Sequence, residues 1–304
     1  MYLYNQNDHI PWEGCAATVG FFDGVHAGHR FLLDELKSVA HKNHVNSVVI
    51  TFDVHPRKVL NADFQPKLLT TLSEKTEQLA YKDVDACVVL NFNKDFAHLT
   101  AYEFIKYILA ERLKVKVLLV GHDHRFGFNR AQGFDDYVKI GEDLGIKVIK
   151  AERFTNENHE HISSSEVRHA LEAGNIDQAN KILTYPYVLS GNVVEGSQIG
   201  RKIGFPTANI QPEDKDKIIP AQGVYAARVH FERKTYRAML NIGKRPTVSN
   251  AEEVKIEAHI LDFEQNIYNK TVKIEFLNRI RDEIKFNNLD ELKTQLQKDR
   301  KMME

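Results

Sequence analysis

Two hydrophobic patterns follow one another along the chain. From Ala16 to Leu183, short apolar runs without alternation are separated by longer stretches with helical spacing. Apolar runs of this kind are typical of parallel strands that are covered on both faces. The expected strands comprise residues 16–19, 47–52, 86–90, 115–120 and 147–150. This alternation of strands and helices predicts a doubly wound α/β domain.

Amphipathic stretches between these runs predict the helices. They cover residues 31–40, 73–81, 101–113 and 134–144, and a further helix opens at the serines near 163 and runs to 173. Thr100 is expected to cap the helix at 101–113. Ligands bind beyond the carboxyl ends of the strands in such sheets, so we expect chemistry in the loops after Val19, Phe52 and Val120.

The second pattern begins near Tyr185-Pro186, where helical spacing stops and the proline favours extended chain before it. Alternating segments follow at residues 187–194, 223–231, 236–242, 254–260 and 271–280. Evenly spaced strands with turn residues between them predict an antiparallel barrel of about six strands. A terminal helix is expected over residues 289–298, capped by Asn288 or Asn287. We therefore expect two domains, residues 1–183 and 184–304.

Composition limits the partners. The chain has 41 Lys and Arg against 42 Asp and Glu, so no overall field attracts nucleic acid or an anionic membrane, and we expect neither as a partner. No apolar run approaches the roughly 18 residues needed to span a bilayer. Cys15 and Cys87 lie in or beside apolar runs, which is typical of buried thiols. We expect a cytoplasmic protein, and the sequence leaves its oligomeric state open.

The loop after Val19 carries the clearest chemical signal. It is Gly20-Phe21-Phe22-Asp23-Gly24-Val25-His26-Ala27-Gly28-His29. A strand that breaks at glycines and restarts as a helix leaves unpaired N–H groups and the positive end of a helix dipole, which together attract anions. If the helix starts near Val25, the imidazoles of His26 and His29 share one face and could donate to phosphate oxygens.

Other interpretations of this loop are open or excluded by its residues. It lacks the Lys-Ser/Thr ending of a P-loop, and its glycines do not fit the dinucleotide-binding fingerprint. A glycine-rich turn with surface histidines remains the alternative, because histidine commonly occupies half-exposed positions. The paired spacing of the two histidines at a strand-to-helix turn favours the anion site.

Three further segments of the first half have two interpretations each. Asp53-Val54-His55-Pro56-Arg57 is a proline turn with a solvated arginine, or part of a ligand loop. The segment 121–130 is a mobile charged loop, or it holds a ribose, a ring face and a phosphate through Asp123 and its arginines. Ser163-Ser164-Ser165-Glu166 is an ordinary helix cap, or with Arg168 a phosphate clamp.

The second half contains Gly191-Asn192-Val193-Val194-Glu195-Gly196 and then Gly200-Arg201-Lys202-Ile203-Gly204-Phe205-Pro206-Thr207-Ala208-Asn209. Its glycines permit close approach to a polyphosphate. Thr207 and Asn209 face one side if a strand starts at Pro206, and their oxygens are acceptable ligands for Mg²⁺. A β-turn beside an edge strand is the alternative. Glu257 lies opposite an apolar face, as an ordinary solvated carboxylate would.

These motifs resemble known families. Gly-x-Phe-Asp-Gly-Val-His-x-Gly-His, Thr-Phe-x-x-His-Pro, Gly-x-Asp-x-x-Phe-Gly and Ile-Ser-Ser-x-x-Val-Arg are similar to the four motifs of bacterial FAD synthetases. Gly-Arg-x-Ile-Gly-Phe-Pro-Thr-Ala-Asn resembles the riboflavin kinase signature. Together they cover nearly the whole chain and imply a bifunctional riboflavin kinase and FMN adenylyltransferase that uses riboflavin, FMN, ATP and Mg²⁺. The alternative is an adenylyltransferase for another phosphorylated metabolite, with a C-terminal barrel that senses flavin without catalysis.

The resemblance also implies roles for individual residues. The catalytic residues would be Glu257, His26 and His29, and Thr207 and Asn209 would hold the metal. The expected ATP contacts for adenylyl transfer are Gly20, Phe21, Asp23, His26, His29, Asp123, Arg125, Ser163, Ser164 and Arg168. Those for the kinase are Gly191, Gly196, Gly200, Arg201, Thr207 and Asn209, and those for flavin are His55, Pro56, Tyr225, Arg245 and Arg279. One departure is His124, where many relatives carry an aromatic residue.

Overall fold

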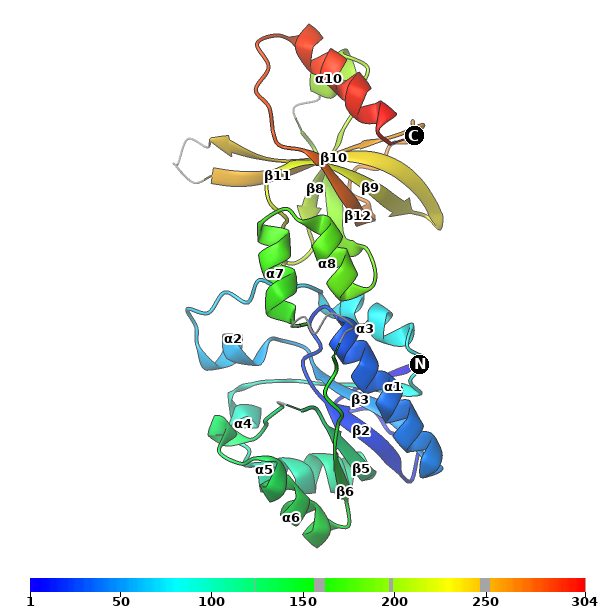
Figure 1. Cartoon of the computed structure of the whole chain (residues 1–304), viewed down its shortest axis with the longest axis vertical. Coiled ribbons are helices and arrows are strands. Elements are labelled where there is room, and N and C mark those ends of the chain that lie inside the picture. Colours follow the sequence, from blue (N-terminus) through cyan, green and yellow to red (C-terminus); the bar gives the residue numbers. More distant parts are fainter. Residues whose placement is uncertain (123, 156–161, 197–198, 247–251, 304) are drawn as a thin grey trace. The chain divides into compact units, whose positions relative to one another are not determined.

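The chain divides into two compact units in the computed structural model (Figure 1). The structure describes residues 1–122, 124–155, 162–196, 199–246 and 252–303. The N-terminal unit consists of Met1–Pro66 and Leu72–Ile162. The C-terminal unit consists of Lys67–Thr71 and Ser163–Glu304. A short segment of the first half of the sequence therefore belongs to the C-terminal unit.

The N-terminal unit is built on a parallel sheet of six strands in the order β1-β4-β3-β2-β5-β6. The strands are β1 (Tyr2–Asn5), β2 (Cys15–Val19), β3 (Asn46–Phe52), β4 (Ala86–Leu90), β5 (Val115–Val120) and β6 (Lys147–Lys150). The predicted parallel α/β fold is confirmed. The sequence pattern missed β1 because this edge strand is mostly exposed and has no apolar run.

Helices flank this sheet (Figure 1). They are α1 (Ala27–Lys42), α2 (Pro56–Leu60), α3 (Leu72–Ala80), α4 (Lys94–Ala97), α5 (Ala101–Glu103), a π-helix (Phe104–Arg112), a 3₁₀ turn (Phe128–Arg130) and α6 (Phe134–Leu144). Neighbouring residues of one strand, such as Val49 and Ile50, belong to two different apolar clusters. Both faces of the sheet are therefore buried, which explains the unbroken apolar runs. Thr100 caps α5 through a capping box with Glu103, as predicted.

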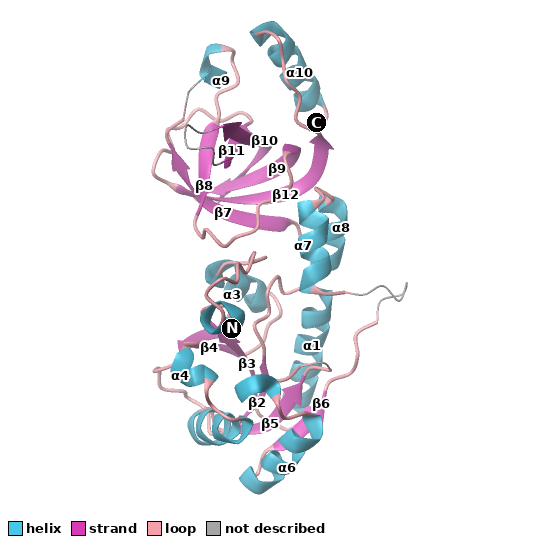
Figure 2. Cartoon of the chain, turned by 90° about the vertical axis from the view of Figure 1, so that its left-hand side faces the viewer, coloured by secondary structure: helices cyan, strands magenta, loops and turns pink. Residues whose placement is uncertain are grey.

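The C-terminal unit is a closed barrel with the strand order β10-β11-β8-β7-β12-β9 (Figure 2). Its strands are β7 (Tyr187–Val194), β8 (Ala208–Pro212), β9 (Gly223–Phe231), β10 (Lys234–Pro246), β11 (Glu252–Ile260) and β12 (Thr271–Arg281). The prediction of a six-stranded antiparallel barrel is confirmed. The condition for placing Thr207 and Asn209 on one face of a strand, a strand start at Pro206, is not met: β8 begins at Ala208, two residues after a proline that has no N–H to give to the ladder.

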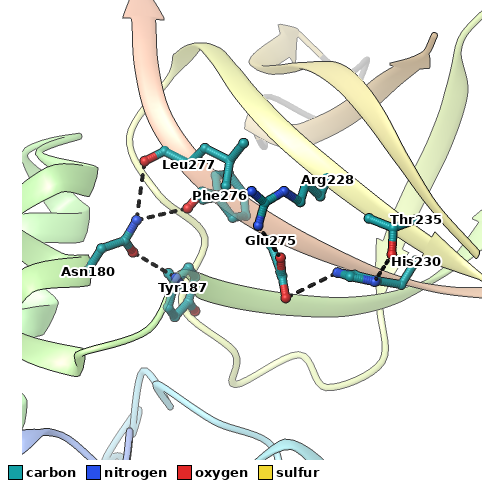
Figure 3. Close-up of polar contacts among 8 residues, drawn as sticks. All are labelled: Asn180, Tyr187, Arg228, His230, Thr235, Glu275, Phe276 and Leu277. Carbon is teal, nitrogen blue, oxygen red and sulfur yellow. Dashed lines mark hydrogen bonds and ion pairs between the residues drawn. The ribbon is translucent and has the colours of Figure 1, made fainter. Parts of the chain in front are cut away.

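A helical hairpin, α7 (Ser164–Glu172) and α8 (Ile176–Leu183), belongs to the same unit as the barrel. Asn180 fastens α8 to it (Figure 3). The Asn180 amide donates to the carbonyls of Phe276 at 2.9 Å and Leu277 at 3.3 Å, and its oxygen accepts from the Tyr187 N–H at 2.7 Å. The domain boundary expected at 183/184 falls directly after this hairpin and stays a prediction.

Further polar contacts tie elements of the barrel unit together. Across β9 and β12, Glu275 pairs with His230 at 3.1 Å and with Arg228 at 3.6 Å (Figure 3). The terminal helix α10 (Leu289–Lys301) begins after Asn288, whose side chain caps it, so of the two candidate caps Asn288 is correct. The fully buried Asp299 of α10 receives the guanidinium of Arg281 at 2.8 Å. Among the described residues, no helix is long and apolar enough to cross a membrane.

Candidate active sites

The first candidate site begins where β2 ends. Gly20 donates its N–H to the Ile50 carbonyl at 3.0 Å, and the chain then turns through Phe22 at φ 54° and Val25 at φ 37°. A positive φ is incompatible with a right-handed helix, so α1 begins at Ala27 and not near Val25. His26 is its N-cap, and its Nδ1 accepts the His29 N–H at 3.4 Å.

The two imidazoles lie face to face at this helix start. Their ring centroids are 3.8 Å apart with an interplanar angle of 18°, so the predicted pairing of His26 and His29 is confirmed. Nδ1 of His29 is buried and has no hydrogen-bond partner among the described residues. Burial lowers the pKa of His29 well below its usual 6.5, and His26, His124 and Lys75 lower it further. At neutral pH His29 is therefore an uncharged imidazole that can still donate one hydrogen bond.

A buried lysine lies beneath this loop. Lys75 of α3 is 2% exposed, and its Nζ donates to the carbonyls of Phe21 at 3.1 Å and Phe52 at 2.9 Å. We did not predict a role for Lys75 from the sequence. The available signal was its spacing, because Lys75 lies four residues before the buried Leu79 on the predicted helix, a spacing that puts both on one face.

The loop after β3 reaches the same place. His55 caps α2, accepting the Arg57 N–H at 3.1 Å on Nδ1, and Pro56 is the first residue of that helix. The His55 ring meets the Phe21 ring edge-on at 4.7 Å, and Phe64 lies 5.1 Å from it. The structure therefore brings together Phe21, which we had assigned to ATP, and His55, which we had assigned to flavin. Asp23, on the same first loop, is 4% exposed.

The third loop is partly described. Asp123 lies outside the described residues, and Arg125 is exposed. Phe126 stacks on Tyr137 with centroids 4.1 Å apart, which anchors the loop to α6. The departure from the family pattern, His124, is turned inward: burial and Arg130 lower its pKa to about 4. His124 thus joins the uncharged imidazole environment of His29.

Ser163, Ser164 and Arg168 lie in the C-terminal unit, whereas the imidazole pair lies in the N-terminal unit. Ser163 caps α7, since its Oγ accepts the Glu166 N–H at 3.3 Å, as ordinary capping requires. Arg168 donates from Nε to the carbonyl of Lys67 at 2.9 Å. The predicted role of these side chains in binding phosphate stays a prediction.

The second candidate site lies on the barrel, where β8 meets β11. Asn209 and Glu257 are register partners across these two strands. Asn209 is 7% exposed, and its Oδ1 has no hydrogen-bond partner in the described part of the chain. Lys255 donates to Oε1 of Glu257 at 2.5 Å, and the Glu257 side chain is 25% exposed. The carboxylate and the carboxamide are thus adjacent groups on one strand pair.

Glycines and a histidine hold the loop around Asn209. A Cβ on Gly196 would lie 1.9 Å from Nδ2 of Asn209, and one on Gly200 would lie 2.2 Å from the Phe205 carbonyl. Only glycine therefore permits these approaches. His259, on β11, contacts the Pro206 carbonyl through Nδ1 at 2.8 Å. We did not assign a role to His259, although it fixes the chain just before Thr207 and Asn209.

The other residues predicted for the kinase have mixed surroundings. Packing requires a glycine at position 191, because a Cβ on Gly191 would lie 2.6 Å from the Ile210 side chain. Arg201 is exposed on the short helix α9 (Ile199–Lys202). Tyr225 is fully buried and donates its hydroxyl to the Ala221 carbonyl. Their contacts with ligands stay predictions.

Arg279 is placed beside a glycine. It donates to the Gln222 carbonyl at 2.5 Å and pairs with Asp282 at 2.8 Å. A Cβ on Gly223 would lie 2.9 Å from its Nε. Arg245 lies in strand β10. The predicted flavin contacts of these two arginines are not tested by this arrangement.

The residues that were expected to hold Mg²⁺ suit it in part. Asn209 offers a buried carbonyl oxygen without a partner, which is a suitable ligand for Mg²⁺. Thr207 lies just before β8, on the segment that His259 fixes. In the described residues, no group of three or more His, Cys, Asp or Glu side chains could hold a metal ion. Mg²⁺ usually keeps several waters and binds substrate phosphates, so a small protein ligand set fits it.

Two known families match the chain, each over a different part. Residues 8–166 match the sequence model of the FAD synthetase family, and residues 183–304 match that of the riboflavin kinase family. These two matches define a two-domain enzyme class that joins nucleotidyl transfer to phosphoryl transfer. The chain belongs to the family of bifunctional riboflavin kinase/FMN adenylyltransferases.

Similar proteins cover nearly the full length. The bifunctional riboflavin kinase/FMN adenylyltransferase of Escherichia coli K12 is 39% identical over 95% of this chain and 91% of its own. That of Bacillus subtilis is 37% identical over 93% and 89%. A crystal structure described as a macrolide-efflux protein from Streptococcus pneumoniae has a TM-score of 0.88 and 33% identity, and covers 100% of this chain and 99% of its own.

Proposed function

We propose that this chain converts riboflavin to FMN on its barrel and FMN to FAD on its α/β unit, with ATP as co-substrate of both steps. One observation carries the proposal. Each unit bears its own polar site, the imidazole pair at the start of α1 and the Asn209–Glu257 pair on the barrel, and each matches its own family.

In the kinase step, the riboflavin 5′-hydroxyl oxygen forms a bond to the γ-phosphorus of ATP, and the bond from that phosphorus to the β–γ bridging oxygen breaks. ADP leaves, and the hydroxyl proton passes to Glu257. Lys255 occupies one site on Oε1 of Glu257, but a carboxylate has about four lone-pair sites and can still accept a proton. We infer that Glu257 is the general base of this step.

Thr207 and Asn209 would hold Mg²⁺ beside the triphosphate. The bound ion would neutralise the charge that spreads over the phosphate oxygens, which is a large part of catalysis in phosphoryl transfer. The unpartnered buried oxygen of Asn209 supports this assignment. Gly196 and Gly200 let the loop pack against Asn209 and the Phe205 carbonyl, and we propose that they also contact ATP.

In the adenylyl step, an FMN phosphate oxygen bonds to the α-phosphorus of ATP, and pyrophosphate leaves with the α–β bridging oxygen. A phosphate is already ionised, so this step needs no strong base. We propose that His26 and His29 orient the two anions by donating hydrogen bonds. The N–H groups at the start of α1 would face the same anions. We also propose that Ser164 and Arg168, in the C-terminal unit, bind phosphate.

One assay tests the proposal. Riboflavin, ATP and Mg²⁺ are incubated with the full chain, and FMN and FAD are followed by chromatography. We expect FMN first and FAD second, and both should disappear in excess chelator. FAD synthesis at full rate without divalent cation would contradict the role of Thr207 and Asn209, and pyrophosphate release that does not depend on flavin would point to another acceptor.

We further propose that both steps take place in the cytoplasm. The cysteines Cys15 and Cys87 are free and buried, which suits a reducing compartment. We also propose that the boundary between the two activities lies near Pro186.

A further inference from the structure

Helix α3 presents a buried polar face to the loop that carries the imidazole pair. Lys75 binds the carbonyls that follow β2 and end β3, and its Nζ lies 4.1 Å from the centre of the Phe21 ring. Burying an ammonium is costly, because it loses its hydration. A charge retained at such a cost beside a ligand loop points to a use in that site.

The loop that Lys75 holds is strained. Phe22 and Val25 both have positive φ, which is unfavourable for a bulky or β-branched residue. Helix α3 restrains both ends of the loop, because Lys75 binds the Phe21 carbonyl and Gln78 binds Arg30, whose Nε donates to the Val25 carbonyl at 3.1 Å. Such strain persists only where surrounding contacts hold it.

Two of the imidazoles at this site, those of His29 and His124, carry little charge of their own. The pKa of His29 lies well below 6.5, and that of His124 is about 4, so both are neutral at pH 7. The triphosphate of ATP and the phosphate of FMN are strongly negative. Lys75 is a cation whose field reaches His29, and a buried charge is screened much less than an exposed one.

We propose that Lys75 is a positioning residue for adenylyl transfer: its ammonium fixes the loop between β2 and α1 and supplies a fixed positive charge behind the imidazole pair. This inference rests on the proposed FMN adenylyltransferase activity. Burial lowers the pKa of Lys75 to about 8, so the charge should be lost in moderately alkaline solution.

Among the described residues, four titratable groups face Lys75 from the surrounding elements. Asp23 comes from the loop after β2, Asp53 from the residue after β3, Cys87 from β4 and His29 from α1. Between pH 7 and 9.5 two of them keep their protonation state, because the pKa of Cys87 is raised to about 12 and that of His29 lies well below 6.5. If FAD formation falls near pH 8 in the wild type but not in a variant with a permanent cation at position 75, the group that titrates is therefore Lys75.

The experiment compares three variants of the full chain. Lys75→Met removes the charge, and Lys75→Arg keeps a cation that stays charged throughout this range. Lys82→Met is the matched control: it removes a half-buried lysine just beyond α3 that pairs with Asp34 at 2.7 Å. FAD formation from supplied FMN and ATP is measured from pH 6.5 to 9.5, and riboflavin phosphorylation is measured on the same preparations.

We expect Lys75→Met to lower kcat/KM for ATP in FAD formation by about tenfold or more. Lys75→Arg should recover most of it, and Lys82→Met should match the wild type. Riboflavin phosphorylation should be unchanged in all three. Wild-type FAD formation should fall as the pH rises through about 8, whereas that of Lys75→Arg should not.

Wild-type rates in Lys75→Met would overturn this inference alone. A wild-type chain that makes no FAD would overturn the proposed function and this inference with it. If Lys75→Met does not fold, the wild-type and Lys75→Arg pH profiles decide, and identical profiles through pH 8 overturn the inference.

Discussion

At the scale of single residues, environment decides chemistry more than residue type does. His26 and His29 are a sequence motif, but only burial shows that His29 is uncharged at neutral pH. In the proposed adenylyl transfer, we therefore expect His29 to donate a hydrogen bond to a phosphate and not to act as a cation. Glu257 also differs from its sequence interpretation, since a residue opposite an apolar face proves to be three-quarters covered and adjacent to Asn209.

His29→Ala should block the conversion of FMN to FAD and leave riboflavin phosphorylation nearly intact. The imidazole pair and Glu257 belong to separate compact units, so little coupling is expected between them. Both rates are measured on one preparation by chromatography. Loss of both activities in a variant that remains folded would contradict the separation of the two sites.

Glu257→Gln should lower riboflavin phosphorylation by about a hundredfold or more, because the amide keeps the shape of the side chain but cannot take a proton. Flavin binding should change little, since the lost role belongs to the transition state. Turnover and flavin affinity are both measured on the variant. Near-normal turnover would make Glu257 an ordinary surface carboxylate.

At the scale of elements, hydrophobic spacing predicts where strands lie but not how the loops between elements turn. The strands β4, β5 and β6 have the predicted bounds. Strand β4 is buried throughout, whereas β5 and β6 carry exposed lysines beside their buried or half-buried apolar residues. The start of α1 could not be predicted, since it depends on the positive φ of Val25. The burial of Lys75 could not be predicted, because amphipathic spacing assigns charged residues to the exposed face of a helix.

His259 of β11 contacts the Pro206 carbonyl just before β8, so removal of this contact should be felt in one reaction. His259→Leu deletes the contact with the Pro206 carbonyl, and we expect the kinase rate to fall about tenfold as Thr207 and Asn209 lose their place. FAD formation from supplied FMN should be unaffected. His230→Leu, which alters a pair on the same barrel, is the control. Equal kinase rates in the two variants would contradict the role of His259.

At the scale of the whole molecule, two compact units share one chain, and the hairpin α7–α8 belongs with the barrel. The two-domain organisation was predictable because the hydrophobic period changes from helical to alternating. The membership of the hairpin was not, because it depends on the bond that Asn180 makes to the carbonyl of Phe276, 96 residues further along the sequence. Local patterns carry no signal of such pairings.

Two fragments test this organisation. A fragment of residues 184–304 should phosphorylate riboflavin without the N-terminal unit, since roughly 100 residues suffice for an independent domain. Residues 163–304 keep α7 and α8 and should melt higher by roughly 5 °C or more, because Asn180 then satisfies three backbone groups. Melting curves and kinase rates are measured for both. Equal melting temperatures would mean that the hairpin adds nothing to the barrel.

The short segment Lys67–Thr71 has a consequence for synthesis on the ribosome. Leu68 donates its N–H to the Asp216 carbonyl, and Lys217 donates from Nζ to the carbonyl of Leu69, 148 positions earlier. The segment therefore leaves the ribosome well before its partners exist. At a synthesis rate of about 5–20 residues per second, the segment is without its partners for on the order of ten seconds. The N-terminal unit folds while this stretch still lacks its partners, so the stretch is open to wrong pairing and to chaperones until the barrel has been made.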